Sequence, residues 1–154
     1  MIGDLQTAAL VERGGSIDWL CFPRFDSGAC FAALLGTPDN GRWLIAPRGE
    51  AWQAGWRYRP DTLVLETEWE TDGGAVRVLD FMPPRGKAPD IVRIVEGVRG
   101  EVEMSSELMS TSPCRPSTIR TMSGALPRGG MKSIRRTAPP SVSHSVSRTS
   151  VRGR

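Results

Sequence analysis

The sequence predicts an all-β fold, an antiparallel β-sandwich over residues 1–108, followed by a disordered basic tail over residues 109–154. Three observations predict it. Seven or eight short apolar runs, separated by Gly, Pro and Asp, occupy the first 108 residues. Residues 62–71 alternate apolar and polar side chains, which is the pattern of a half-buried strand. All ten aromatic and all 17 acidic residues of the chain lie before residue 109.

The first two predicted strands, residues 7–11 and 17–22, form a hairpin. The connection between them contains Gly14 and Gly15, which can adopt the positive φ angles of a tight turn. Residues 30–35 are rich in Ala and Leu and are followed by a glycine, so a short helix is predicted there.

Six further strands are predicted downstream: residues 43–46, 56–59, 62–71, 75–82, 91–96 and 101–108. The clearest pair is the hairpin of residues 62–71 and 75–82, joined by Asp72-Gly73-Gly74. The last two strands are predicted as another hairpin around Gly97 and Gly100. Short strands bounded by such turn residues are typical of a twisted antiparallel sandwich.

The strand over residues 62–71 carries three glutamates. Alternation places one set of side chains on a shared face: Leu63, Leu65, Thr67 and Trp69. Glu66, Glu68 and Glu70 then share the opposite face with Val64. Because a half-buried antiparallel strand presents its polar face to water, we expect these glutamates to be solvated and do not interpret them as catalytic acids.

Charge divides the chain near Leu108. Residues 1–108 carry 11 Lys and Arg against 17 Asp and Glu, a net charge of −6, whereas residues 109–154 carry nine Lys and Arg and no acid, a net charge of +9. Ser, Thr, Pro, Gly and Arg make up 32 of the 46 residues in this second segment. With no aromatic residue and little apolar area to offset its ordering entropy, the segment is expected to be disordered.

Composition and spacing exclude several functional classes. No run reaches the roughly 18 apolar residues that a membrane helix needs. Residues 1–10 lack the basic and apolar regions of a signal peptide, so we expect a cytoplasmic protein. The three cysteines and the single His144 do not have the spacing of a metal site, and no nucleotide-binding glycine motif is present. No metal and no cofactor are therefore expected.

One segment carries a candidate binding site. Asp18, Trp19, Arg24 and Asp26 lie within nine residues around a proline. Indole rings stack on sugar rings, and carboxylates and guanidinium groups hydrogen-bond to hydroxyls, so this set predicts a carbohydrate-facing loop. The alternative interpretation places Trp19 and Phe22 in the core and pairs Arg24 with Asp26 on the loop.

Seven segments, in order, resemble the opening of bacterial glycoside hydrolase family 15 proteins, a family that includes glucoamylase-like and trehalase-like enzymes. The segments are IGDLQTAALV (residues 2–11), GSIDWLC (15–21), PRFDS (23–27), FAALLG (31–36), YRPDTLVLET (58–67), DFMPPRG (80–86) and IVRIVEG (91–97). The resemblance covers roughly residues 1–108 and ends there. The residues that follow have the composition of a GC-rich gene read out of frame, which we interpret as a frameshifted or truncated gene product.

The resemblance implies an N-terminal β-sandwich that precedes a large (α/α) barrel, with an inverting pair of glutamates in the barrel. Inversion needs two carboxyl groups about 6.5–9.5 Å apart, one protonated and one that activates water. We expect this chain to end before such a barrel and to contain an incomplete sandwich, so no catalytic residue is carried over to it.

Two functions follow as hypotheses. The first is a truncated, non-catalytic N-terminal domain of an α-glucoside hydrolase, inactive alone, that supports an (α/α) barrel and partly walls its sugar site. Its expected partners are that barrel and an α-glucoside, with no membrane. The alternative is a small binding protein whose basic tail contacts nucleic acid or an acidic surface. Because the tail has no aromatic residue for base stacking, we do not expect nucleic acid to be a partner.

Overall fold

The computed structural model describes residues 1–110, 119–123, 133–134 and 144–153, and this part of the chain is nearly all β-structure. The strands are β1 (Ile2–Gly3), β2 (Ala8–Val11), β3 (Ser16–Cys21), β4 (Ala29–Phe31), β5 (Arg42–Pro47), β6 (Trp52–Tyr58), β7 (Leu65–Thr71), β8 (Gly74–Phe81), β9 (Ile91–Met109), β10 (Ile119–Ser123), β11 (Ser133–Ile134) and β12 (His144–Arg152). Two short 3-10 helices, η1 (Ala33–Leu35) and η2 (Pro38–Asn40), lie between β4 and β5.

Among the described residues, no helix has the length and apolar character needed to cross a membrane. The prediction of an all-β fold is confirmed.

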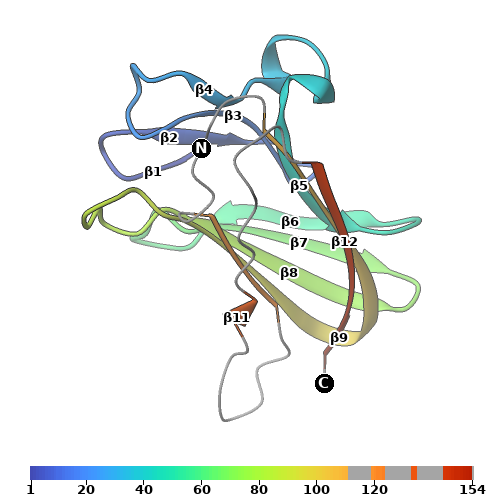
Figure 1. Ribbon diagram of the computed structural model, residues 1–154. Helices are drawn as coiled ribbons and strands as arrows, with labels where there is room; N and C mark the ends of the chain where they lie inside the picture. Colours follow the sequence, from blue (N-terminus) through green and yellow to red (C-terminus); the bar gives the residue numbers. More distant parts are fainter. Residues whose placement is uncertain (111–118, 124–132, 135–143, 154) are drawn as a thin grey trace.

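Strand β9 joins the two layers of the molecule (Figure 1). Its first half pairs with β8, beside which β7 and β6 complete one layer. Its second half pairs with β5, through which β3, β2 and β1 follow in the other layer. The neighbours along this path are antiparallel, as predicted, and β10 adds a parallel pairing with the first half of β9. The two layers are therefore parts of one continuous curled sheet.

The strands predicted from alternation and turn residues are confirmed, with small shifts at their ends. Residues 7–11, 17–22, 43–46, 56–59, 62–71 and 75–82 correspond to β2, β3, β5, β6, β7 and β8. The β2–β3 hairpin turns at Gly15, which has a φ of 88°. A Cβ atom at Gly15 would lie 2.2 Å from the carbonyl oxygen of Ile45 in β5. The close approach of β5 to this turn therefore requires glycine.

The predicted helix over residues 30–35 is wrong. Its first two residues belong to β4, and the helical part is confined to the three residues of η1. Phe31 lies opposite Leu20 of β3, and both side chains are fully buried, whereas Leu34 and Leu35 are exposed. Pairing with β3 buries the start of this apolar run, so tertiary contact overrides the helix propensity of Ala and Leu.

The predicted hairpin around Gly97 and Gly100 is also wrong, because β9 passes through both glycines. At this point the pairing between β8 and β9 advances by one residue in β8 and by two in β9, so that Val98 is an extra residue. A β-bulge of this kind bends and twists a strand without ending it. Turn-forming residues here mark the place where β9 leaves one layer and enters the other.

The expected disorder over residues 109–154 falls mostly outside the described residues, on 111–118, 124–132, 135–143 and 154. The described parts of that segment are β10, β11 and β12. Strand β12 pairs with β9 over nine residues, from His144 opposite Met109 to Arg152 opposite Glu101.

A buried arginine lies in the core between the two layers. The core is built mainly from apolar side chains of both layers, among them Ile17, Phe31, Trp43, Ile45, Leu65, Val78 and Ile91. The side chain of Arg93 in β9 is 0% exposed and that of Asp80 in β8 is 1% exposed. Arg93 Nε donates to Asp80 Oδ1 at 2.7 Å, and Arg93 Nη2 donates to Asp80 Oδ2 at 3.1 Å.

The same guanidinium also reaches the opposite layer. Arg93 Nη1 donates to the carbonyl oxygen of Trp43 at 2.6 Å, and Arg93 Nη2 donates to that of Gly15 at 2.7 Å. The guanidinium carbon lies 5.1 Å from the centre of the Trp43 ring, within cation–π range. One side chain therefore ties β8 and β9 to β5 and the β2–β3 turn.

The substitution Arg93→Met is expected to lower the free energy of unfolding by about 3–5 kcal/mol, because it leaves the Asp80 carboxylate buried without a cationic partner. The double variant Arg93→Met/Asp80→Leu removes both charges and is expected to be more stable than the single variant. Urea unfolding followed by tryptophan fluorescence measures both values. A single variant within 0.5 kcal/mol of the native protein would contradict this role of the pair.

Candidate functional site

The predicted carbohydrate-facing residues lie on β3 and on the loop that follows it. Asp18 and Trp19 are consecutive in β3 and half-buried, so their side chains point to opposite faces of the sheet. Arg24 and Asp26 are exposed, and Arg24 Nε lies 3.0 Å from Asp26 Oδ1. Asp18 accepts a hydrogen bond from the hydroxyl of Ser16. Each polar residue of the predicted set is thus held by a near neighbour in sequence.

This arrangement agrees with part of each interpretation of the loop. The ion pair between Arg24 and Asp26 is the one that the alternative interpretation expects. Trp19 is only half-buried, however, and lies opposite Leu10 of β2, which is 37% exposed. An indole with one accessible part beside an apolar neighbour suits contact with a ring or with another protein surface. Sugar contact by this loop stays a prediction.

A cluster of ion pairs surrounds Glu66 on β6, β7 and β8. Arg59 Nε lies 3.0 Å and Arg77 Nε 3.5 Å from Glu66 Oε2, and Arg57 donates a hydrogen bond to the other carboxylate oxygen. The side chain of Glu66 is only 5% exposed, so the expectation of a solvated Glu66 is wrong. Three arginines cover this carboxylate and exclude water from it. Its neighbour Glu68 is 22% exposed and also pairs with Arg77.

Strand register explains the cluster. Glu66 lies opposite Arg57 of β6, and Glu68 lies opposite Arg77 of β8. Residues that face each other across antiparallel strands are close enough for ion pairing. The register of the hairpin formed by residues 62–71 and 75–82 was therefore a signal that could have identified the Glu68–Arg77 pair from sequence.

Asp4 is another buried carboxylate, and both of its oxygens have partners. Arg85 Nε lies 2.8 Å from Asp4 Oδ2, and the backbone N–H groups of Gln6 and Thr7 donate to Asp4 Oδ1 at 3.0 and 2.9 Å. Burial alone would raise the pKa of Asp4, but the Arg85 guanidinium and the two N–H groups outweigh it and hold this pKa below its usual value.

The same balance applies to Glu66. Burial would raise its pKa, whereas the hydrogen bond from Arg59 and the charges of Arg77, Arg57 and Arg59 lower it, and the net shift is downward. A general acid in glycoside hydrolysis needs the opposite shift, because it must be protonated near neutral pH. Asp4 and Glu66 are therefore suited to structural ion pairs and not to acid catalysis.

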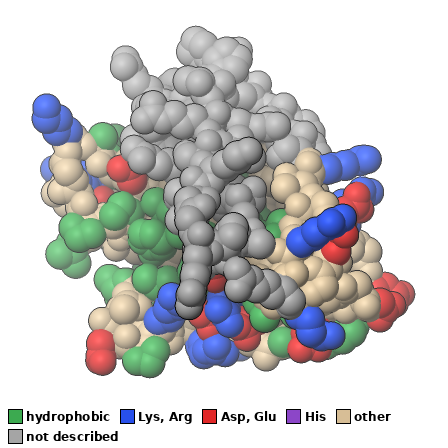
Figure 2. Space-filling model, turned by 90° about the horizontal axis from the view of Figure 1, so that it is seen from below, with side chains coloured by type: hydrophobic (Ala, Val, Ile, Leu, Met, Phe, Trp, Pro, Cys, Tyr) green, Lys and Arg blue, Asp and Glu red, His purple; other side chains and the backbone are tan. Residues whose placement is uncertain are grey.

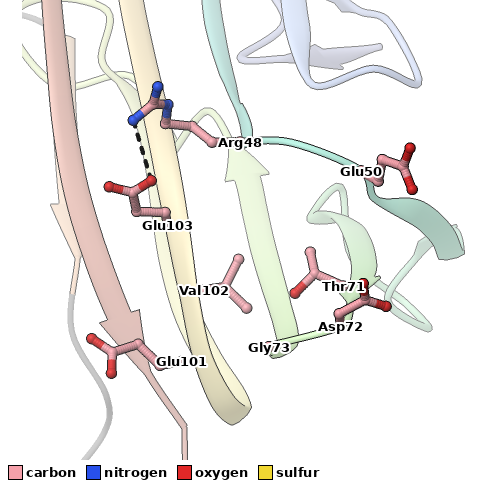
Figure 3. Close-up of a pocket in the computed structure, with 8 residues that line it drawn as sticks. All are labelled: Arg48, Glu50, Thr71, Asp72, Gly73, Glu101, Val102 and Glu103. Atoms are coloured by element: carbon pink, nitrogen blue, oxygen red, sulfur yellow. Dashed lines mark hydrogen bonds and ion pairs between the residues drawn. The ribbon is translucent and has the colours of Figure 1, made fainter.

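Acidic side chains also border an open cleft with a volume of about 410 Å³. Its lining residues are Arg48, Glu50, Thr71, Asp72, Gly73, Glu101, Val102 and Glu103. Figure 3 shows the carboxylates spread around the cleft, with Arg48 Nη1 3.2 Å from Glu103 Oε2. Within the described part of the chain, no group of three or more His, Cys, Asp or Glu side chains is placed to hold a metal ion.

The face seen in Figure 2 shows two kinds of surface. Acidic and basic side chains lie beside one another along its lower margin, and hydrophobic side chains gather on the left. Large exposed apolar residues of the chain include Phe25, Leu34, Leu35 and Leu63. The surface of the described domain thus carries neighbouring acidic and basic side chains, together with exposed apolar residues that suit contact with another protein surface.

Comparison of the sequence with known proteins identifies a matching family and several relatives. The chain matches the family model described as trehalase-like, N-terminal, over residues 1–107. It is 39% identical to a trehalase of Mycolicibacterium smegmatis over 81 residues, which are 53% of this chain and 12% of that protein. It is 37% identical to a trehalase of Mycobacterium tuberculosis over 92 residues, 60% of this chain and 13% of that protein.

A third relative is a trehalase of Thermoplasma volcanium, 34% identical over 116 residues, which are 71% of this chain and 19% of that protein. No solved structure shows a significant match. The matched region thus covers less than a fifth of each of these three relatives.

The Glu66→Gln substitution tests the ion-pair cluster. Because the folded-state pKa of Glu66 lies below the ordinary value of 4.5, its charge stabilises the fold above that pH, and this contribution is lost as pH falls through the folded-state value. At pH 7 we expect the variant to lose about 1–3 kcal/mol of stability, and at pH 3 less. Urea unfolding at the two pH values measures the difference. Glu70→Gln, on the same face of β7, is the control, and equal losses for both variants would contradict the cluster's role.

Proposed function

This chain belongs to the family of trehalase-like N-terminal domains, and from that membership we propose that residues 1–107 are a non-catalytic N-terminal domain of an α-glucoside hydrolase. The observation that carries the proposal is the extent of the match. Residues 1–107 fit the family model, and the matched region accounts for only 12–19% of three curated trehalases. Most of a trehalase therefore lies outside the region that this chain resembles.

The chemistry of the buried carboxylates supports a non-catalytic role. Inverting glycosidases need one protonated and one ionised carboxyl group about 6.5–9.5 Å apart. Asp4 and Glu66 are each bonded to arginine, with a pKa shifted away from that of a general acid. We infer that the catalytic pair belongs to an (α/α) barrel that would follow this domain in a complete enzyme.

In that setting the domain supports the barrel and contributes to the wall of its sugar site. The residues of the β3 segment proposed to face the sugar are Trp19 of β3 and Arg24 and Asp26 of the loop after it, whereas Asp18 points to the opposite face of β3. Phe25 lies within this segment and Leu34 and Leu35 follow it, and these exposed apolar side chains would pack against the barrel. The substrate class is an α-glucoside such as trehalose, the location is the cytoplasm, and no cofactor is required.

The isolated chain is expected to show no trehalase or α-glucosidase activity, because the proposed catalytic pair lies outside it. Release of glucose from trehalose and from maltose, compared with a heat-treated sample, measures this. Turnover clearly above that background would overturn the non-catalytic assignment.

A chimera tests the proposed role of the β3 segment. In the Thermoplasma volcanium trehalase, the matching segment is replaced by residues 1–107 of this chain. We expect the chimera to hydrolyse trehalose and Trp19→Ala to raise its KM, because the half-buried indole would lose a stacking contact with sugar. Trp52→Ala, which removes a 51% exposed tryptophan of β6, is the control. Equal KM values for the two variants would contradict sugar contact by Trp19.

A further inference from the structure

The second half of β9 is paired on both sides. Strand β5 pairs with it from Arg42 opposite Met109 to Pro47 opposite Met104. Strand β12 pairs with its other side over nine residues (Figure 1). Without β12, the N–H and C=O groups along this side of β9 would form an open sheet edge, which is a template for another strand.

The inner face of β12 completes the core. Val151 is 4% exposed and lies opposite Val102, which is 3% exposed. Thr149, two residues earlier, is half-buried opposite Met104. Since alternate residues of a strand point to the same side, β12 presents these side chains to the apolar interior. Val151 belongs to the main core cluster of the molecule.

The end of β12 packs directly on the backbone of β9. The N–H of Gly153 donates to the carbonyl oxygen of Gly100 at 2.7 Å. A Cβ atom at Gly153 would lie 2.2 Å from the backbone nitrogen of Arg99, and one at Gly97 would lie 2.4 Å from the carbonyl group of Arg152. Glycine at both positions therefore permits this close approach.

The outer face is complementary in charge. Glu101, Glu103 and Glu107 lie on the same, outer face of β9, because side chains an even number of positions apart in a strand point to one side. Strand β5 and the residue after it supply arginines for two of them, with N–O distances of 3.1 Å to Glu107 and 3.2 Å to Glu103. Arg152 of β12 supplies the third, with its Nε 3.0 Å from Glu101 Oε2, and Ser150 donates a hydrogen bond to the same carboxylate.

We propose that the edge of β9 from Glu101 to Met109 is a strand-binding site for an extended basic segment, and that residues 144–152 of this chain occupy it intramolecularly. Its specificity has two parts. An apolar residue opposite Val102 enters the core, and a basic residue opposite Glu101 neutralises the outer carboxylate. The positive charge of Arg152 thus neutralises a carboxylate of the acidic residues 1–108 of the same chain. The site does not depend on the proposed hydrolase function.

The first test uses the full-length chain and a labelled peptide of residues 144–153. Val151→Asp in the chain places a charge in the core and weakens the resident strand. We expect saturable binding of the peptide to this variant and at least about tenfold weaker binding to the native chain, whose own strand fills the site. A peptide carrying the same Val151→Asp change is the control and should bind neither chain.

The second test keeps the fold intact by changing exposed charges. In the full-length chain, Arg152→Glu is expected to speed amide hydrogen exchange in residues 101–109 and 144–152 by about fivefold, and adding Glu101→Arg should restore the native rate. Arg24→Glu, the same charge change at an exposed loop residue outside the β9–β12 pair, is the matched control. High salt should reduce the difference between native and Arg152→Glu chains.

Two results would overturn the proposal. One is the absence of peptide binding to the Val151→Asp chain together with unchanged exchange in Arg152→Glu. The other is a concentration-dependent dimer that the peptide dissociates, because the strand would then be supplied by a second copy and not intramolecularly. Sedimentation velocity at several concentrations, with and without peptide, separates these cases.

Discussion

The bonding of Arg93 is the constraint on which the rest of the structure depends. A guanidinium group in an apolar interior is tolerated only when its donors are satisfied. Asp80 satisfies one side, and the carbonyl groups of Trp43 and Gly15 satisfy the other. These partners come from both layers, so the positions of β8, β5 and the β2–β3 turn are set relative to β9. Gly15, which has a positive φ angle and lies close to the carbonyl group of Ile45, is part of the same arrangement.

Arginine–carboxylate pairing recurs at three depths in the molecule. Both partners are buried at Asp80, only the carboxylate is buried at Asp4 and Glu66, and both partners are at least partly exposed along the outer face of β9. In each case the partner comes from a different strand or loop. These acidic residues of the described domain therefore connect separate strands and loops.

Local patterns predicted most strands, and the errors came from long-range contacts. Alternation and turn residues identified β7 and β8, but the glycines near Val98 have the same sequence signature in a bulge as in a hairpin. The burial of Glu66 depends on arginines of other strands. Arg93 was a missed signal, because alternation from Ile91 to Val95 places it on the buried face. At the candidate site, one interpretation of the sequence expected the Arg24–Asp26 pair and the other an accessible Trp19, and residue types alone could not decide that Trp19 is half-buried.

The sharing of β9 between both layers has a consequence for how the chain reaches its folded state. The β7–β8 hairpin joins residues that are close in sequence, whereas the ion pair between β5 and β9 joins residues 65 positions apart. Closing such a long loop is entropically costly and makes the contact order high, which slows folding. During synthesis, neither layer can be completed until β9 has left the ribosome. The edges of β5 and β8 that pair with β9 therefore stay unpaired until β9 has been synthesised.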